Sequence, residues 1–203
     1  MKVYCFYEPV NAFIKNQVFN DKRIIDYWVK SWSFYSWEPI VLCLKDLKKD
    51  EAYASLLDKA LAFPTTNHLE FEVYCYLRWL CMIERGGWFS DFDVMNYGFK
   101  PVAYGNSVVS TRETLAGSVI YGPKNFYKNI IKMFLQVDSS LEKHHVSDML
   151  ILHNYFLPDA VLKIEKIKYD RKSLLQHYAV SEYSYEERAN TILKDERFKK
   201  IIC

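Results

Sequence analysis

Residues Tyr74 to Val94 read Tyr-Cys-Tyr-Leu-Arg-Trp-Leu-Cys-Met-Ile-Glu-Arg-Gly-Gly-Trp-Phe-Ser-Asp-Phe-Asp-Val. The largely apolar first part is typical of a helix that continues to Arg85. The paired glycines that follow tolerate the left-handed backbone that closes a last helical turn. Trp88 and Phe89 then suit a buried extended segment. The sequence therefore predicts a central helix, a stop at Gly86-Gly87 and a strand that ends in two acids.

Asp91 and Asp93 are the first candidate site residues. In extended backbone their side chains point to the same side, because the side-chain period of a strand is two. Two carboxylates that face one way repel each other unless a cation or a donor-rich ligand lies between them. This pattern predicts a divalent metal with oxygen ligands, of the kind that holds a diphosphate. The alternative is a solvated surface turn, where Asp-x-Asp pairs are common.

Three short motifs, Leu77-Arg78, Gly86-Gly87 and Asp91-Phe92-Asp93, together resemble the signature of the nucleotide-sugar glycosyltransferases that carry a DXD motif. They are most similar to the branch with the fungal initiating mannosyltransferases, the clostridial glucosylating toxins and related bacterial and large-virus capsular or glycan transferases. Arg78 lies thirteen positions before Asp91 (91 − 78), a separation that also resembles this branch. The chain departs from the toxins at Cys75, where they carry an acid.

The resemblance implies an α/β fold with a single GT-A domain, in which a mostly parallel sheet is flanked by helices. It implies a metal-dependent enzyme that moves a sugar from a nucleotide-diphosphate donor, expected to be a UDP-sugar, to a glycan acceptor. Mn²⁺ or Mg²⁺ would be held by Asp91 and Asp93, with Asp91 and Phe92 also at the donor. Residues 1–100 would form the donor-binding half and residues 101–203 the acceptor-binding half of one catalytic domain.

Arg78 is unusual because it lies in a helix that is apolar nearly all round. A guanidinium is costly to bury unless it meets an anion, and its planar fork suits carboxylate or phosphate oxygens. Two functional roles are open, namely contact with the donor and support of the acid pair. The structural alternative is an ion pair with Glu70, Glu72 or Glu84.

Lys2 to Tyr7 is a short apolar run that predicts the first strand of the sheet. Ligands of open α/β sheets bind outside the carboxyl ends of the strands. Tyr4, Phe6 and Tyr7 are therefore candidates for the ring that stacks on a nucleotide base. The alternative is that these aromatic rings face helices across the sheet.

His177 begins the stretch His177-Tyr178-Ala179-Val180-Ser181, which resembles the His-Trp-Ala-Gly-Ser-Trp close of the same transferase branch. Tyr178 and Val180 replace two residues of that motif, and Glu182 replaces its last tryptophan. The resemblance implies that His177 lies near the metal and the diphosphate. Imidazole suits a third ligand position beside two carboxylates when the metal is manganese. The alternative is a polar loop histidine.

Asp148 follows His144-His145-Val146-Ser147 and is expected near the start of a helix that runs to Phe156. Adjacent histidines diverge on a helix and rarely chelate together. Asp148 is a candidate for the acceptor-activating base or a wall of the acceptor cleft. The alternative is that Ser147 and Asp148 are first-turn residues matched to the helix dipole.

The composition places these motifs in one soluble domain. Of 203 residues, 50% are hydrophobic, which allows one sizeable core. The net charge of +2 gives no case for nucleic acid as a partner. No apolar run is long enough to cross a bilayer and the N-terminus lacks a signal-peptide layout, so a cytoplasmic location is expected, in a bacterium or a virus-infected cell. Five scattered cysteines indicate reduced core residues rather than disulfides or a zinc site.

The remaining segments predict a succession of helices and strands. Helices are expected over 21–37, 51–63, 124–137 and 185–201, a charged link over 45–50, a buried strand over 40–44, further strands over 107–110 and 118–121, and an edge strand over 161–169. A cap at Thr66 or Asn67 is expected before the central helix. The polar segment Thr111-Arg112-Glu113-Thr114 is a candidate acceptor-side loop.

Two other classes of function are compatible with parts of the sequence. Haloacid-dehalogenase-like phosphohydrolases use Asp-x-Asp as nucleophile and acid, but there the pair directly follows an N-terminal strand, whereas here it lies mid-chain. A non-catalytic carbohydrate-binding module is favoured only by the aromatic content of 17%. Such a module predicts no nucleotide binding and no effect of metal on the melting temperature.

Overall fold

The structure is a computed structural model that describes residues 1–10, 22–100, 105–106, 108–110, 119–138, 144–156, 165–166, 174–178 and 185–203. The expected acceptor-side loop at 111–114 lies outside the described residues. No helix in the described part of the chain is both long enough and apolar enough to pass through a membrane.

The centre of the molecule is a six-stranded sheet with the order β2-β1-β3-β6-β5-β7. Its strands are β1 (Lys2–Phe6), β2 (Glu38–Leu42), β3 (Gly87–Ser90), β5 (Val109–Ser110), β6 (Val119–Gly122) and β7 (Glu165–Lys166). β1 pairs in parallel with both β2 and β3, and β5 pairs in parallel with β7. β6 runs antiparallel to its neighbours β3 and β5. Among the described strands of this sheet, all except β6 therefore point the same way, which confirms the mostly parallel sheet.

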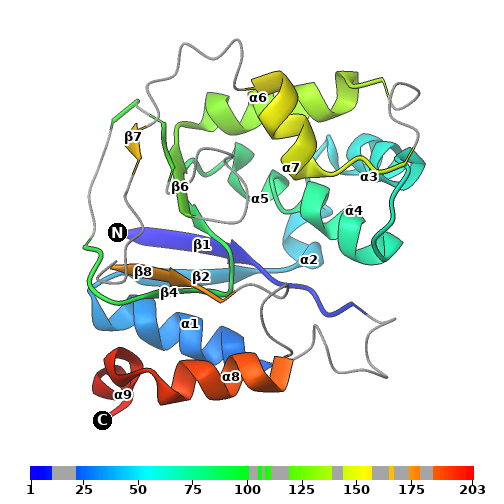
Figure 1. The fold of residues 1–203 in the computed structure, drawn as a ribbon. Coiled ribbons are helices and arrows are strands. Elements are labelled where there is room, and N and C mark those ends of the chain that lie inside the picture. Colours follow the sequence, from blue (N-terminus) through cyan, green and yellow to red (C-terminus); the bar gives the residue numbers. More distant parts are fainter. Residues whose placement is uncertain are drawn as a thin grey trace.

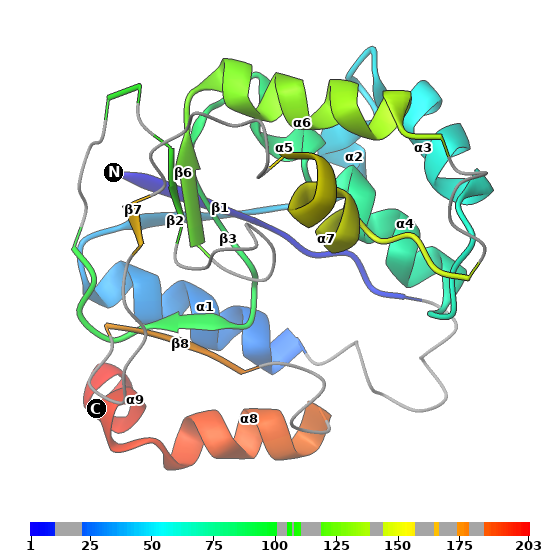
Figure 2. The same cartoon turned by 45° about the horizontal axis from the view of Figure 1, so that its top comes forward.

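Helices cover both faces of this sheet (Figures 1 and 2). One face carries α2 (Leu44–Leu47), α3 (Tyr53–Ala62), α4 (Leu69–Leu77), α5 (Leu80–Ile83), α6 (Lys124–Gln136) and α7 (Asp148–Ile151), which continues into a π-helical turn (Leu152–Phe156). The other face carries α1 (Lys22–Phe34), α8 (Tyr185–Lys194), α9 (Glu196–Ile202) and a small antiparallel sheet of β4 (Val94–Asn96) and β8 (Leu175–His177). The expected α/β fold, with helices on both faces of a mostly parallel sheet, is confirmed.

Each face of the sheet has its own apolar core. Trp79 and Phe134 are among the buried side chains between the sheet and α3 to α7. Trp28 and Trp32 of α1 are buried on the opposite face together with Phe198 of α9. Alternate residues of a strand point to opposite faces, so β1 sends Val3 and Cys5 to the second core, whereas Tyr4 and Phe6 face the first.

The central helix is broken where the sequence predicted continuity. α4 ends at Leu77, and α5 begins at Leu80 and ends at Ile83. At the break, the amide of Trp79 donates to Tyr76 three residues earlier, the tighter 3₁₀ pattern, at 3.4 Å. The glycine stop is confirmed, because Gly86 and Gly87 have φ angles of 64° and 86°. The residues at the break, Arg78 and Trp79, both belong to the site described below.

The second strand also differs from its prediction. It spans Glu38–Leu42 rather than 40–44, and it lies at the edge of the sheet with Val41 exposed. An edge strand accommodates Pro39 because the missing amide hydrogen is not needed by a further strand. The charged link after it contains the short helix α2, whose Asp46 accepts a hydrogen bond from the amide of Cys43 at 2.9 Å.

The other expected helices are confirmed as α1, α3 and α6, with ends that differ by a few residues. The C-terminal helix is divided, because Asp195 accepts a hydrogen bond from the amide of Arg197 at 2.9 Å and starts α9. The cap of α4 is His68, with no side-chain capping bond. Asn67, an expected cap, instead donates to Glu72 at 2.8 Å. Within the expected edge strand, β7 does lie at the edge of the sheet.

Candidate metal centre

The two acids lie in a turn and not in a strand. β3 ends at Ser90, and Asp91 to Asp93 form the turn that leads into β4. The prediction that the two acids lie in extended backbone, and converge through its period of two, is therefore wrong. The acids still converge, because one ligand atom each from Asp91, Asp93 and His177 lie within 4.8 Å of one another. This cluster is at the carboxyl end of β3, the edge where ligands of such sheets bind.

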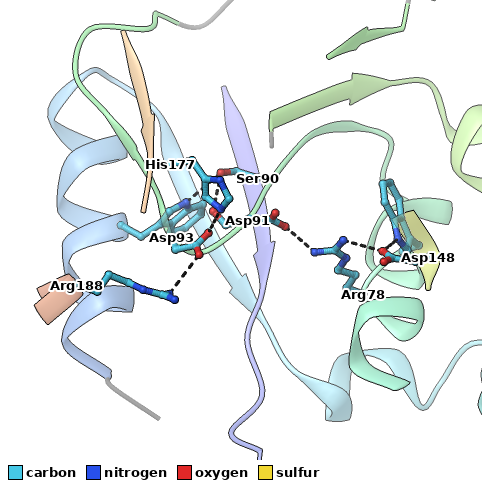
Figure 3. Close-up of polar contacts among 9 residues, drawn as sticks. Arg78, Ser90, Asp91, Asp93, Asp148, His177 and Arg188 are labelled. Carbon is cyan, nitrogen blue, oxygen red and sulfur yellow. Dashed lines mark hydrogen bonds and ion pairs between the residues drawn. The ribbon is translucent and has the colours of Figure 1, made fainter. Parts of the chain in front are cut away.

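His177 reaches the acids through the small sheet. β8 pairs antiparallel with β4 and sets His177 opposite Val94, directly after the turn. The amide of Tyr178 donates to the carbonyl of Asp93 at 3.0 Å. Its neighbour His177 then brings Nε2 to 3.2 Å from Oδ1 of Asp93. The structure thus places the three sequence-predicted ligands together (Figure 3).

The backbone of the acidic turn is held from α1. The indole of Trp28 donates to Oγ of Ser90 at 3.3 Å, and that hydroxyl donates to the carbonyl of Asp91 at 2.9 Å. The indole of Trp32 donates to the carbonyl of Val94 at 3.0 Å. Because Trp28, Trp32 and Ser90 are fully buried, the turn is fixed by packed side chains rather than by solvent.

Arg78 joins Asp91 to Asp148. Its Nη1 donates to Oδ1 of Asp91 at 2.8 Å, and its Nη2 donates to Oδ2 of Asp148 at 2.7 Å. Of the Asp91/Asp93 pair, Arg78 thus contacts Asp91, and its second contact is with Asp148 (Figure 3). The alternative partners bond elsewhere: Glu70 accepts from Tyr74, Glu72 accepts from Asn67, and Glu84 pairs with Lys128.

Asp148 is buried at the first turn of α7, with 2% of its surface exposed. Its Oδ2 also accepts from the indole of Trp79 at 2.9 Å. Ser147 lies just before the first turn, where the structural alternative had placed it, and caps the helix by accepting from the amide of Leu150 at 3.2 Å. Cys75, where the toxins carry an acid, is a thiol whose pKa is raised by burial.

Arg188 is a site residue that the sequence analysis missed. It lies on α8, is fully buried, and donates from Nη1 to Oδ2 of Asp93 at 3.2 Å. The apolar residues Ala189 and Ile192, one and four positions after it, are the sequence signal that could have placed Arg188 on the buried face of the helix. Both are fully buried. An arginine on the apolar face of an amphipathic helix needs a buried acid, and Asp93 is that acid.

The charges of the site leave room for a cation. Three carboxylates face two guanidinium groups, which leaves one negative charge before any charge on His177 is counted. Burial raises the pKa of Asp91, with Arg78 opposing the rise and Asp93 adding to it. Burial would also raise the pKa of Asp93, but His177 and Arg188 outweigh it, so this pKa is lowered. Of Asp91 and Asp93, Asp93 is thus the acid held more firmly in its ionised form.

The residues fit a divalent metal. Two carboxylate oxygens and one imidazole nitrogen are a donor set that suits Mn²⁺, and the oxygens alone suit Mg²⁺. The Asp93–His177 separation of 3.2 Å allows both atoms to bind one ion. Each acid keeps an arginine that fixes its orientation, as outer partners do in metal sites.

The three N-terminal aromatic candidates lie in different surroundings. Phe6 is buried, with its ring 6.1 Å from that of Tyr74, so for this residue the structural alternative describes the contact. The ring of Tyr4 lies 5.8 Å from the guanidinium of Arg85. Tyr7 is partly buried, and its ring lies 5.2 Å from that of Phe92, within the acidic turn. Of the three, Tyr7 therefore contacts the turn that carries the acids.

The chain has a distant structural similarity to a solved protein described below. No protein-family model matches the chain, and no curated protein matches it. A solved structure described as a glycosyltransferase involved in the glycosylation of the major capsid of PBCV-1 is similar at a TM-score of 0.46 and 10% identity. The match covers 95% of this chain and 98% of that one. At this distance no residue role or activity is carried over from it.

Proposed function

We propose that this chain is a metal-dependent glycosyltransferase that moves a sugar from a nucleotide-diphosphate donor, a UDP-sugar, to a glycan acceptor. The observation that supports this most is the convergence of Asp91, Asp93 and His177 at the carboxyl end of β3. The donor set and the excess negative charge suit a divalent cation, and the position at the sheet edge suits a nucleotide.

Asp91, Asp93 and His177 would hold Mn²⁺ or Mg²⁺, and the ion would supply positive charge beside the departing nucleoside diphosphate. The chain's own residues prepare this site. Asp91 and Asp93 supply oxygens, Arg78 and Arg188 orient one acid each, and His177 supplies a nitrogen. Because the acids are held before the donor arrives, little reorganisation accompanies the reaction.

The donor lies along the first half of the chain in this proposal. Tyr7 and Phe92 offer adjoining aromatic rings beside the acids, where this proposal puts the nucleotide base. Tyr4 lies earlier in the chain, within β1. Residues 1–100 then bind the donor and residues 101–203 face the acceptor. His177 and Arg188 come from the second half, so the metal centre draws on both.

Metal binding and donor cleavage test the proposal. Isothermal titration should show Mn²⁺ binding by the wild type, tighter UDP binding with Mn²⁺ than with EDTA, and UDP release from at least one UDP-sugar. Asp93→Asn should lose Mn²⁺ binding and UDP release. Asp46→Asn is the matched control, because it removes a carboxylate whose hydrogen bonds, within the described residues, are with Cys43 at the start of α2.

Full UDP release by Asp93→Asn would refute the assignment. Release of inorganic phosphate from sugar phosphates, with no release of UDP from UDP-sugars, would instead support the phosphohydrolase alternative. Absence of both activities, and of any effect of Mn²⁺ on the melting temperature, would support a non-catalytic module.

A further inference from the structure

Asp148 is bonded in a way that differs from the expectation for a proton acceptor. It is 2% exposed, and one oxygen, Oδ2, takes both the guanidinium of Arg78 at 2.7 Å and the indole of Trp79 at 2.9 Å. Charge-assisted bonds of this length are strong and directional. A general base must reach the proton that it removes, and this oxygen is already engaged by two donors.

The same contacts connect Asp148 to the metal centre. The second arm of Arg78, Nη1, holds Oδ1 of Asp91 at 2.8 Å. Asp148, Arg78 and Asp91 therefore form a chain of two ion pairs that runs from α7, through the break between α4 and α5, to the acidic turn (Figure 3). Because the guanidinium is planar, fixing one arm fixes the direction of the other.

We infer that Asp148 is a positioning residue, which acts through Arg78 to orient the carboxylate of Asp91 toward the metal. This inference rests on the proposed function for its metal, and it gives Asp148 a different role from the acceptor-activating base. Trp79 belongs to the same hydrogen-bonded group, since its indole donates to the Asp148 oxygen that also accepts from Arg78. Both donors to this oxygen lie at the break between α4 and α5, where they are adjacent in sequence.

The first test is Mn²⁺ binding by the full chain, measured by isothermal titration or by the electron paramagnetic resonance signal of free Mn²⁺. Asp148→Asn should weaken Mn²⁺ binding about 10-fold, the lower end for partners that orient metal ligands. Trp79→Phe removes only the indole donor to Asp148 and should weaken binding about 3-fold. Trp37→Phe is the matched control, because its indole donates to the carbonyl of Phe99 on the other face at 2.8 Å, and it should leave Mn²⁺ affinity unchanged.

Wild-type Mn²⁺ affinity in both Asp148→Asn and Trp79→Phe would overturn the inference. If Asp148→Asn kept that affinity but no longer released UDP from a UDP-sugar, the result would favour Asp148 as the acceptor-activating base. If Asp148→Asn does not fold, the Mn²⁺ affinity of Trp79→Phe is compared with that of Trp37→Phe. Equal affinities would overturn the inference.

If the wild type binds no Mn²⁺, the proposed function fails, and the connection is tested by thermal unfolding. Asp91→Asn and Asp148→Asn should then be non-additive in Tm, since both remove a partner of the same guanidinium. Additive shifts would overturn the connection itself.

Discussion

The two acids of one turn are supported in different ways. Asp91 faces Arg78, whose side chain is 15% exposed and also serves Asp148. Asp93 faces Arg188, whose side chain is fully buried, and shares its other oxygen with His177. The first arginine thus links Asp91 to a second, buried acid, whereas the second arginine contacts Asp93 from inside the core. Residues two positions apart can therefore depend on opposite faces of a sheet.

Removal of Arg78 should have the largest effect on stability. Arg78→Met leaves both Asp91 and Asp148 without their cation, and Asp148 is 2% exposed, so we expect a loss near the upper end of about 3–5 kcal/mol. Urea unfolding measures it. A loss below about 1 kcal/mol would show that the two ion pairs do not hold this side of the turn.

Arg188→Met should lower the free energy of unfolding somewhat less, by about 3 kcal/mol, because His177 still faces Asp93. The control is Arg197→Met, whose ion pair with Asp195 is 35% exposed at the arginine and should contribute no more than about 1 kcal/mol. Urea unfolding of both variants makes the comparison. Equal losses would contradict the assignment of Arg188 as a buried partner of Asp93.

Divalent metal should strengthen the whole turn. If Mn²⁺ binds the folded chain alone, stability should rise by about 2.7 kcal/mol when its concentration is 100 times the dissociation constant. His177→Ala should lose most of this rise, since it removes the only nitrogen of the three grouped ligands. Thermal unfolding with Mn²⁺ and with EDTA provides the measurement. An unchanged rise in His177→Ala would exclude the histidine as a ligand.

The smallest effect concerns the pH dependence of the metal-free chain. The folded-state pKa of Asp93 is lowered, so its contribution to stability is present above the unfolded pKa of about 3.9 and is lost as the pH falls through the folded value. The folded-state pKa of Asp91 is raised, so its contribution is present below the unfolded pKa and is lost as the pH rises through the folded value.

Urea unfolding in EDTA from pH 3 to 7 should therefore separate the two acids. Relative to the wild type, Asp93→Asn should become less stable as the pH rises, whereas Asp91→Asn should become more stable. Parallel curves for the two variants would show that the acids have equivalent surroundings.

Local sequence was sufficient for much of the fold. The glycine stop, β3 and the amphipathic helices α1 and α6 follow from backbone preference and apolar period, both of which act over a few residues. The break at Arg78 and Trp79 was not predictable in this way. It accompanies contacts with Asp148, which lies 70 positions beyond Arg78.

The candidate site was predicted in its residues more than in its geometry. The acids and His177 were named correctly as a group, although the turn that joins the acids was taken for a strand. The pairing of His177 with Val94 depends on two strands that are remote in the chain, so no local pattern encodes it. Arg188 was overlooked because its segment was interpreted only as an amphipathic helix over 185–201, while packing places this arginine in the core.

The order of these residues along the chain has a consequence for biosynthesis. A growing polypeptide delivers the acidic pair well before the ribosome adds His177 and Arg188, which come from β8 and α8. Until β8 and α8 dock, the nascent chain lacks the imidazole and the buried guanidinium that face Asp93. A ribosome-stalled chain that stops short of β8 would therefore carry the acid pair without the third member of the group.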